Sequence, residues 1–586
     1  MNIFRHTASR YLLVALLSTS SATALAATPA KQMTPPDAPS VASGAWLTGL
    51  VAARQGDHAV AATALISALD ADPTRSEILR QAFLENTLAE TPEALSLAER
   101  LLKQKTPHSM IATLVIGNDA ARHGNWQEAL RSYKLTERHS PSQLLLPFLT
   151  AWCLAGAGNG AAAINTLTAA ASHGSPLAPF YLTHAALIAG FTDQHAQEAL
   201  LWKQASSIMP GTDMLLVRGK AAWLWQQGKK EEARAMIRQA TKADSLLALA
   251  TPELQASIGI PPITSALQGL AQSYLTMAAL FRAQAAQDPR HGVGSQEEEA
   301  SSIMLHMALS LDPALTEARL LLAEIESDHD HNTAALALLK QVTDSNPLNR
   351  VARFRRALLE EKNGEHGTAR QELENIIAEV PQQILPIQSL ASLLFDQADY
   401  PASAAMWSKA IALTQGKDTP ANWPLLFGRA AALEQTGDWP AAEKDLRAAR
   451  EQVPNEPLIL NFLGYGWIQH HQNQEEACDI LRQALMLDPD DTAIRDSLGW
   501  ALLETGHTEE AIKMLEQAAE ENPEDPEINY HLGVAYWKAG RRTEAIDQWN
   551  VASGLKPAPD IKASLKKALE EAHQPRPDTG KTAAKP

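Results

Sequence analysis

Four adjacent side chains in this sequence could coordinate a metal ion, because carboxylate oxygens and imidazole nitrogens are common metal ligands. They are Asp328, His329, Asp330 and His331. A calcium loop would also need a glycine and a terminal glutamate, which this stretch lacks. Neither a H-E-x-x-H motif nor paired C-x-x-C motifs occur, and a histidine pair at 470–471 falls in an equivalent turn. We therefore expect hydrated polar turns and no metal site.

No other group of residues has the spacing of a catalytic or cofactor site. The stretch D-T-G-K-T at 578–582 has the ending of a phosphate-binding loop, but the first glycine of that motif would fall at Pro575. No strand pattern precedes it and no helix pattern follows it, and no G-x-S-x-G elbow is present. We expect no catalytic residue, no cofactor and no enzymatic activity.

The elements that carry these residues repeat with a period of 34 residues. Prolines recur at that spacing in two sets, which are Pro313, Pro347 and Pro381, and Pro489, Pro523 and Pro557. Glycine and alanine keep the same phase between them, at Gly499 and Gly533, and at Ala477, Ala511 and Ala545. Small residues and prolines in phase at this spacing indicate stacked helical hairpins.

Each unit divides into two helices when the small residue is placed at position 8. Positions 4, 7, 8 and 11 then share one face of the first helix, and positions 20, 24 and 27 share one face of the second. In the unit that starts at Pro526, position 7 is Leu532, position 8 is Gly533 and position 24 is Trp549. Small residues let the two helices approach, and the proline at position 32 ends the second helix.

This pattern resembles the tetratricopeptide repeat (TPR). The stretches that carry the resemblance are N-F-L-G-Y-G-W at 461–467, D-S-L-G-W-A-L at 496–502 and A-Y-W at 535–537. It implies an all-α, right-handed superhelical solenoid of about fourteen TPR-like helical hairpins with a C-terminal capping helix. The layout is also similar to exported multi-TPR proteins of alphaproteobacteria, a group of undefined function.

Two breaks interrupt the period, a long one at 246–300 and a shorter insertion between units at 414–421. A Pro-rich loop at 260–262 and a glycine-containing loop at 288–295 predict one irregular hairpin between two lobes. The expected order is a signal peptide at 1–26, a Pro-rich linker at 27–41, an N-terminal TPR-like array at 42–247, the irregular hairpin at 248–315, a C-terminal TPR array at 316–559, a capping helix at 560–573 and a disordered tail at 574–586.

The N-terminus has the features of a secretory signal peptide. Arg5 and Arg10 precede a short apolar run, and Ala-Leu-Ala at 24–26 fits a cleavage site after Ala26. We therefore expect a periplasmic protein, and no remaining stretch is apolar for long enough to predict a transmembrane span. The net charge of −17 disfavours nucleic acid as a partner, because an acidic protein repels phosphates. Cys153 and Cys478 lie in alanine-rich helical patterns and are expected to be buried, inert thiols.

A second stripe of the first helices is aromatic and polar near the C-terminus. The resemblance to TPR proteins implies that positions 2, 5, 9, 12 and 13 line a concave groove in which protein segments bind. The predicted partner-binding residues are Asn461, Tyr465, Asp496, Trp500, Tyr530, Trp537 and Lys538. Exposed tyrosine and tryptophan on stacked helices suit an extended peptide or a helix. Packing of these aromatics against neighbouring hairpins or the capping helix is the alternative.

The sequence favours a non-catalytic scaffold or adaptor that binds envelope proteins or peptide segments, in cell-envelope or exopolysaccharide assembly. Two alternatives stay open at this point. One is a protein that binds a carbohydrate or a peptidoglycan fragment on aromatic side chains. The other is an enzyme with a site in the irregular segment 248–302, where Asp288, His291 and the glutamates at 297–299 are the only candidates. Self-association is a further option.

Overall fold

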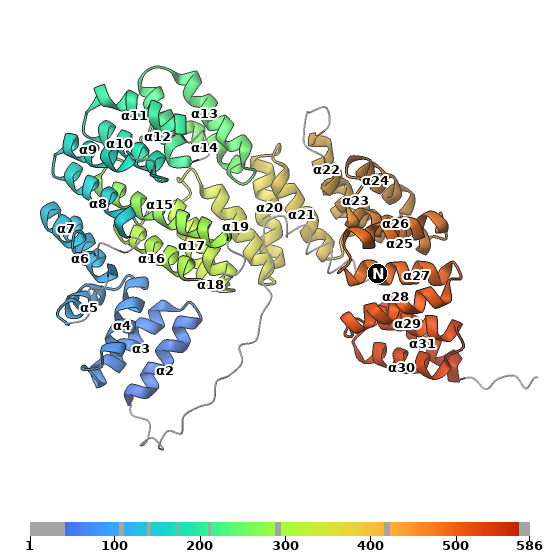
Figure 1. Ribbon diagram of the computed structural model, residues 1–586. Helices are drawn as coiled ribbons and strands as arrows, with labels where there is room; N and C mark the ends of the chain where they lie inside the picture. The colour runs from blue at the N-terminus through green and yellow to red at the C-terminus, as the bar shows by residue number, and fades with distance from the viewer. Residues whose placement is uncertain are drawn as a thin grey trace, which may run out of the picture. The chain divides into compact units, whose positions relative to one another are not determined.

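The computed structural model describes residues 41–104, 110–136, 142–172, 175–208, 213–287, 295–414 and 422–573. Within these ranges the chain is helical and contains no strand, which confirms the all-α solenoid (Figure 1). The predicted signal peptide, the linker up to residue 40 and the tail at 574–586 lie outside the described residues. No helix in the described ranges combines the length and the apolar character that a membrane span requires.

The helices group into two units, and the described part of the first runs from residue 41 to 383. We call it the N-terminal unit. It begins with α2 (Val41–Arg54), α3 (His58–Ala71), α4 (Ser76–Leu88), α5 (Glu93–Leu102), α6 (Met110–Arg122), α7 (Trp126–Tyr133), α8 (Ser142–Gly156), α9 (Gly160–Ala171), α10 (Ala178–Phe191), α11 (His195–Ile208), α12 (Met214–Gln226) and α13 (Lys230–Ala243). It continues with the 3₁₀ helix η1 (Leu247–Ala250), α14 (Thr251–Ala256), α15 (Ala266–Gln287), α16 (Gln296–Leu311), α17 (Thr316–Asp328), α18 (Asn332–Lys340), α19 (Asn349–Lys362) and α20 (His366–Glu379).

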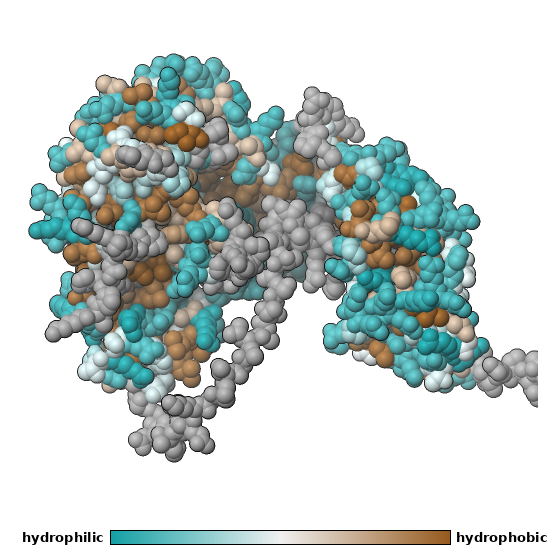
Figure 2. Space-filling view, viewed as in Figure 1, coloured by the Kyte–Doolittle hydropathy of each residue, from teal (hydrophilic) through white to brown (hydrophobic). Residues whose placement is uncertain are grey.

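The described part of the second unit, the C-terminal unit, runs from residue 384 to 573. It consists of α21 (Ile384–Asp396), α22 (Tyr400–Thr414), α23 (Trp423–Gln435), α24 (Trp439–Gln452), α25 (Pro457–Gln469), α26 (Gln474–Leu487), α27 (Thr492–Glu504), α28 (Thr508–Glu521), α29 (Pro526–Lys538), α30 (Arg542–Gly554) and α31 (Pro559–His573). Its hairpins follow one another in sequence order, and Figure 2 shows that its visible surface is largely hydrophilic.

Aspartates start several first helices, as expected for residues that satisfy free backbone N–H groups. Asp491 accepts hydrogen bonds from the backbone of Ala493 and Ile494 at 2.8 and 3.0 Å. Asp525 plays the same part at α29. The prolines of the 34-residue period lie in the turns just after the second helices: α28 ends at Glu521, two residues before Pro523. Local capping and the proline stops therefore set the hairpin boundaries.

The glycine at position 8 serves the close contact that the sequence predicts. A Cβ atom added at Gly533 would lie 2.4 Å from the indole ring of Trp549, which is at position 24 of the same hairpin. One added at Gly499 would lie 2.6 Å from Leu515. Both distances are too short for a real contact, so a side chain here would separate the two helices of the hairpin.

The irregular segment is a hairpin, but it does not separate two lobes. Helices α15 and α16 pack against each other and also against α8, α6 and α4 of the preceding array. In Figure 1, α15 and α16 lie inside the arc that α4–α13 describe. The boundary between the two units falls instead between Gln383 and Ile384. The sequence placed this boundary elsewhere because the break in the repeat was interpreted as a linker between lobes. In the structure the break contains helix α15, which packs inside the N-terminal array.

The first hairpin of the N-terminal unit contacts its later helices. The imidazole Nε2 of His331, just before α18, lies 3.1 Å from the backbone oxygen of Arg54 at the end of α2. The ring of His58 in α3 packs edge-on against that of His306 in α16, with centroids 5.8 Å apart. The N-terminal array therefore turns back on itself, which explains how α15 and α16 become enclosed.

Candidate functional site

The seven predicted groove residues lie on three consecutive first helices, α25, α27 and α29, but they are not equally accessible. Asn461, Tyr465 and Asp496 are buried, with exposed fractions of 5%, 4% and 0%. The half-buried residues are Trp500, Tyr530 and Trp537, and Lys538 is exposed. The expectation that all seven line an open groove is therefore wrong for the first three.

A buried ion pair connects α27 to α29. The imidazole Nδ1 of His531 lies 2.9 Å from the carboxylate of Asp496, and the ring of Trp500 stacks on His531 with centroids 4.2 Å apart. Burial raises the pKa of Asp496. Burial pulls the pKa of His531 down, but the adjacent Asp496 carboxylate outweighs it, so this pKa lies above its ordinary value. The pair serves to join successive repeats.

A second polar contact spans two repeats. The hydroxyl of Tyr465 on α25 donates to Glu527 Oε1 on α29 over 3.0 Å and accepts from Gln469 over 2.7 Å. Burial raises the pKa of Tyr465 well above its ordinary value. Tyr465 is thus engaged by side chains of its own unit, and it is a packing residue in this structure.

The remaining predicted residues keep part of their surface. Trp537 packs on Trp549 with centroids 5.4 Å apart, and the guanidinium of Arg542 lies 3.6 Å from its ring centroid. Lys538 forms an ion pair of 3.0 Å with Glu504. We call Trp500, Tyr530 and Trp537 the aromatic face of α27 and α29, and Lys538 lies at its edge.

Sequence reasoning missed His531, Glu527 and Gln469. Asp496 and His531 are 35 residues apart, one repeat plus one residue, so the pair joins position 5 of one unit to position 6 of the next. An acid at a position that faces the next helix is the available signal, since a buried carboxylate needs a partner. The repeat pattern indicated which residues share a face, but not that the following repeat covers this face.

One buried acceptor on this stripe has no hydrogen-bond partner. The side-chain oxygen of Asn461 is buried without a donor among the described residues. Asn461 is four residues before Tyr465, so the two share one face of α25. An unsatisfied buried acceptor costs free energy, so this oxygen lowers the stability of the repeat stack at α25.

The corresponding stripe of the N-terminal unit is filled by helix α15. Asn118 on α6 and Trp152 on α8 both occupy position 9 of their repeats, as Tyr465 and Trp500 do in the C-terminal unit. The hydroxyl of Tyr274 on α15 donates to Asn118 Oδ1 over 2.9 Å. A Cβ atom at Gly269 of α15 would lie 2.1 Å from the ring of Trp152, so the backbone of α15 rests directly on that indole.

A buried histidine completes this contact. Trp152 Nε1 donates to Nδ1 of His184 on α10 over 2.9 Å, and Thr276 of α15 lies 3.5 Å from its Nε2. Burial lowers the pKa of His184 to about 3, so the imidazole is neutral at pH 7. Burial also raises the pKa of the nearby Cys153 thiol to about 12, which makes this cysteine a poor nucleophile.

The residues that could bind a metal have protein partners instead. Asp328 pairs with Arg282 of α15, and Asp330 lies 2.7 Å from Lys362 Nζ. His331 Nδ1 lies 2.9 Å from Glu326. In the irregular segment, Glu298 also pairs with Arg282, while Asp288 and His291 lie outside the described residues. These contacts join α15, α16 and α17.

More than half of the chain matches the family model described as tetratricopeptide repeat, over residues 8–76, 114–179, 320–384, 389–457 and 497–554. The chain belongs to the tetratricopeptide repeat family. TPR repeats mediate protein–protein interactions, so membership supports a protein-binding scaffold, and the family is generally non-catalytic.

The detected similarity to individual proteins is partial. A "TPR repeat-containing protein PA4667" of Pseudomonas aeruginosa is 31% identical over 140 residues, which make up 24% of this chain and 23% of that protein. The matched stretch thus spans less than a quarter of the relative. A tetratricopeptide repeat protein from Parabacteroides merdae is 14% identical, with 44% of this chain and 98% of that chain covered at a TM-score of 0.37. The Cut9–Hcn1 assembly of the APC/C is also 14% identical, covering 91% and 97%, at 0.37. Scores of this size support no functional argument.

Proposed function

We propose that this TPR protein is a non-catalytic scaffold that binds a segment of another protein along α25, α27 and α29. The observation that carries the proposal is the aromatic face: Trp500, Tyr530 and Trp537 keep accessible surface on two consecutive repeats. Aromatic side chains supply much of the binding energy at protein interfaces, because they bury large areas at little cost in conformational entropy. Lys538 adds a charge at its edge.

The contrast between the two units supports this location. In the N-terminal unit, α15 already covers the position-9 residues, as a bound partner would. Among the described residues of the C-terminal unit, no inserted helix plays that part: α25, α27 and α29 pack mainly on helices of the successive repeats and on α31, and Tyr465 reaches across two repeats to Glu527.

We further propose that the scaffold works in the periplasm, in cell-envelope or exopolysaccharide assembly. The support is the signal peptide pattern, with Arg5 and Arg10 before the apolar run and a cleavage site after Ala26. Mass spectrometry of the protein recovered from the periplasmic fraction tests this step. A mature N-terminus at Ala27 is expected, and an intact chain found only in the cytoplasmic fraction would contradict the location without touching the binding proposal.

The binding proposal is tested by photo-crosslinking in the native envelope, with a benzophenone residue in place of Val534 on α29, which is half-buried between Tyr530 and Trp537. The same crosslinked protein should appear in repeated experiments. Its yield should fall about tenfold when Trp500→Ala and Trp537→Ala are combined. Trp423→Ala is the matched control, since Trp423 is a half-buried tryptophan of the same unit on α23. Equal loss in the control, or a product that consists of carbohydrate, would contradict a protein-binding face at this place.

A further inference from the structure

Helix α31 stands where the first helix of another hairpin would stand. Four residues separate the end of α30 from the start of α31 at Pro559, just as four residues separate the end of α28 from the start of α29 at Pro526. Counted from these prolines, Leu565 corresponds to Leu532, and both are 2% exposed. α31 packs on α29 and α30, as a first helix packs on the preceding hairpin. It therefore repeats half of a TPR unit.

The face that a second helix would cover is closed in α29. Positions 4, 7, 8 and 11 of this helix are Asn529, Leu532, Gly533 and Tyr536, and all four are buried. Helix α30 lies against this face, and Trp549 of α30 occupies the space above Gly533. In a complete hairpin, then, these positions form the contact between the two helices.

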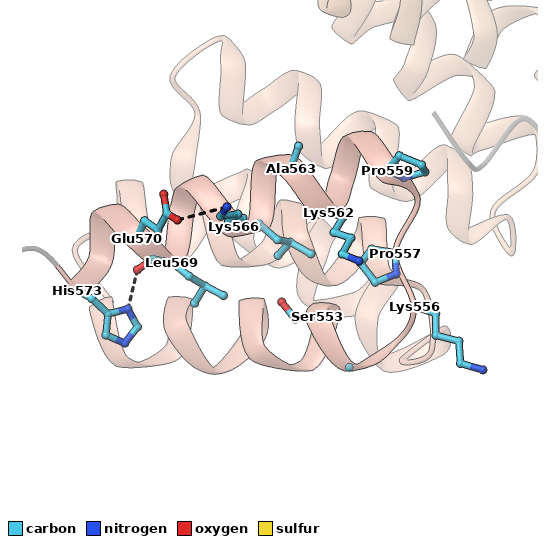
Figure 3. A pocket seen from close by; sticks show the side chains of 12 residues that line it. Ser553, Lys556, Pro557, Pro559, Lys562, Ala563, Lys566, Leu569, Glu570 and His573 are labelled. Atoms are coloured by element: carbon cyan, nitrogen blue, oxygen red, sulfur yellow. Dashed lines mark hydrogen bonds and ion pairs between the residues drawn. The ribbon is translucent and has the colours of Figure 1, made fainter.

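The same face is only partly covered in α31. Its equivalent residues are Lys562, Leu565, Lys566 and Leu569, and together they line a cleft of about 1110 Å³ between α31 and the end of α30 (Figure 3). Leu565 is buried at the base of the cleft, whereas Leu569 is half-buried and supplies apolar surface that Pro557 and Pro559 extend toward the preceding turn. The cleft is the place that a second helix would take, and none lies there among the described residues.

The rim of this cleft is basic in an acidic protein. Lys556, Lys562 and Lys566 line it with a single acid, Glu570, which lies 3.9 Å from Lys566. The three lysines are exposed. Because the whole chain carries a net charge of −17, this local excess of positive charge would attract a negatively charged partner.

The residue at position 8 determines what can bind. In α29 it is Gly533, which leaves no room for a Cβ beside α30. In α31 it is Lys566, so a second helix cannot approach as closely as α30 does. An occupant must keep its apolar side on Leu569 and the two prolines and place carboxylates beside the lysines. We propose that the cleft between α30 and α31 binds an acidic amphipathic helix of a partner protein, which takes the position of the missing second helix.

The residues that follow α31 in the sequence are unsuited to this role. The segment 574–586 contains prolines at 575, 577 and 586, which disfavour a helix. It carries one acid, Asp578, against Arg576, Lys581 and Lys585. Its positive charge would be repelled by the lysines of the rim.

Fluorescence anisotropy of labelled peptides with the full chain tests the proposal. The probe is a helical peptide with leucines on one side and glutamates along both edges, and the comparison peptide has lysines in place of the glutamates. We expect the acidic probe to bind and the basic peptide not to. Combining Lys562→Glu and Lys566→Glu should weaken the acidic probe at least about tenfold and allow the basic peptide to bind. Lys567→Glu is the matched control, because Lys567 is exposed on the same helix but does not line the cleft.

Three results would overturn the proposal. The first is equal binding of the two peptides, or none of the acidic probe. The second is an equal loss of affinity in Lys567→Glu, which would show that binding depends on overall charge. The third comes from a benzophenone residue in place of Leu569 in the peptide-free protein: a crosslink to residues 574–586 or to a second copy would show that the chain itself fills the cleft. All the lysines changed are exposed, so the variants are expected to fold.

Discussion

The residues at the same repeat position make different contacts in the two units. At position 9, the N-terminal unit has Asn118 and Trp152, which helix α15 covers. The C-terminal unit has Tyr465, which contacts Glu527 two repeats later, and Trp500, which stacks on His531 of the next repeat. In one unit a separate helix of the chain fills the stripe, and in the other the stripe is partly closed by the repeats themselves and keeps its aromatic face.

This difference shows that the repeat register alone does not define a binding surface. Helix α15, the first helix of the irregular hairpin, binds to the N-terminal stripe through a glycine contact and a tyrosine hydroxyl. The chain thus contains its own example of a helix held by TPR first helices. The C-terminal unit has the same type of stripe without such a helix among its described residues, and this is where we place the partner.

The strongest test of the filled stripe is Trp152→Ala. Trp152 is fully buried, so its removal leaves a cavity under α15 and an unpaired His184. We expect the N-terminal unit to lose about 3–5 kcal/mol of unfolding free energy. Hydrogen exchange resolved by helix should show the loss in α8, α10 and α15 and not in α25–α29. Trp225→Ala, which removes a half-buried tryptophan from the same unit, should cost much less, and an equal cost would contradict a central role for the α15 contact.

The C-terminal unit should be most sensitive at its buried ion pair. His531→Ala leaves the Asp496 carboxylate buried without its partner, and a cost of about 3 kcal/mol or more is expected in α27 and α29. Replacing both residues by leucine should recover most of this loss, because no buried charge then remains. Denaturant unfolding followed by exchange in these helices measures both variants. A double variant as unstable as the single one would show that packing, and not the unpaired charge, determines the effect.

Two of the buried histidines, His184 and His531, predict opposite pH dependence. The pKa of His184 is lowered to about 3, so the unfolded chain binds its proton more readily, and the N-terminal unit gains stability as pH rises from about 3 to 6.5. The pKa of His531 is raised, so its contribution is present below pH 6.5 and is lost as pH rises through its folded-state value. Each effect is at most about 1.4 kcal/mol per pH unit. Hydrogen exchange in α10 and α29 across this pH range measures both effects. His184→Gln should remove the pH dependence of stability in α10, and His531→Gln should remove that in α29.

The sequence predicted the fold where the structure depends on contacts within a single hairpin. Gly533 against Trp549 and Pro523 after α28 could be predicted, because close approach and helix termination depend on residues within one hairpin. The unit boundary could not. Nothing in the spacing of residues 248–315 indicates that α15 packs on Trp152, since that contact depends on how far the array curves over many repeats.

The candidate site was predictable only in part, for the same reason. The sequence placed Trp500, Trp537 and Lys538 on one stripe, and the structure leaves them accessible surface. It also placed Tyr465 and Asp496 there, and contacts with the next repeats bury both. Those contacts depend on the angle between successive hairpins, which small differences in packing residues determine.

The smallest expected effect concerns Lys538, and it separates binding from stability. In its ion pair with Glu504 the lysine is exposed and the glutamate half-buried, with 43% and 24% of the side chains accessible, so Lys538→Ala should change the unfolding free energy by less than about 1 kcal/mol. If the aromatic face of α27 and α29 binds a protein segment, the same change should still reduce the yield of the crosslink from position 534. Lys513→Ala, at an exposed lysine on the second helix α28, should alter neither quantity. A large loss of stability with an unchanged crosslink would mean that Lys538 serves the stack of repeats, and the C-terminal stripe would then resemble the filled N-terminal one.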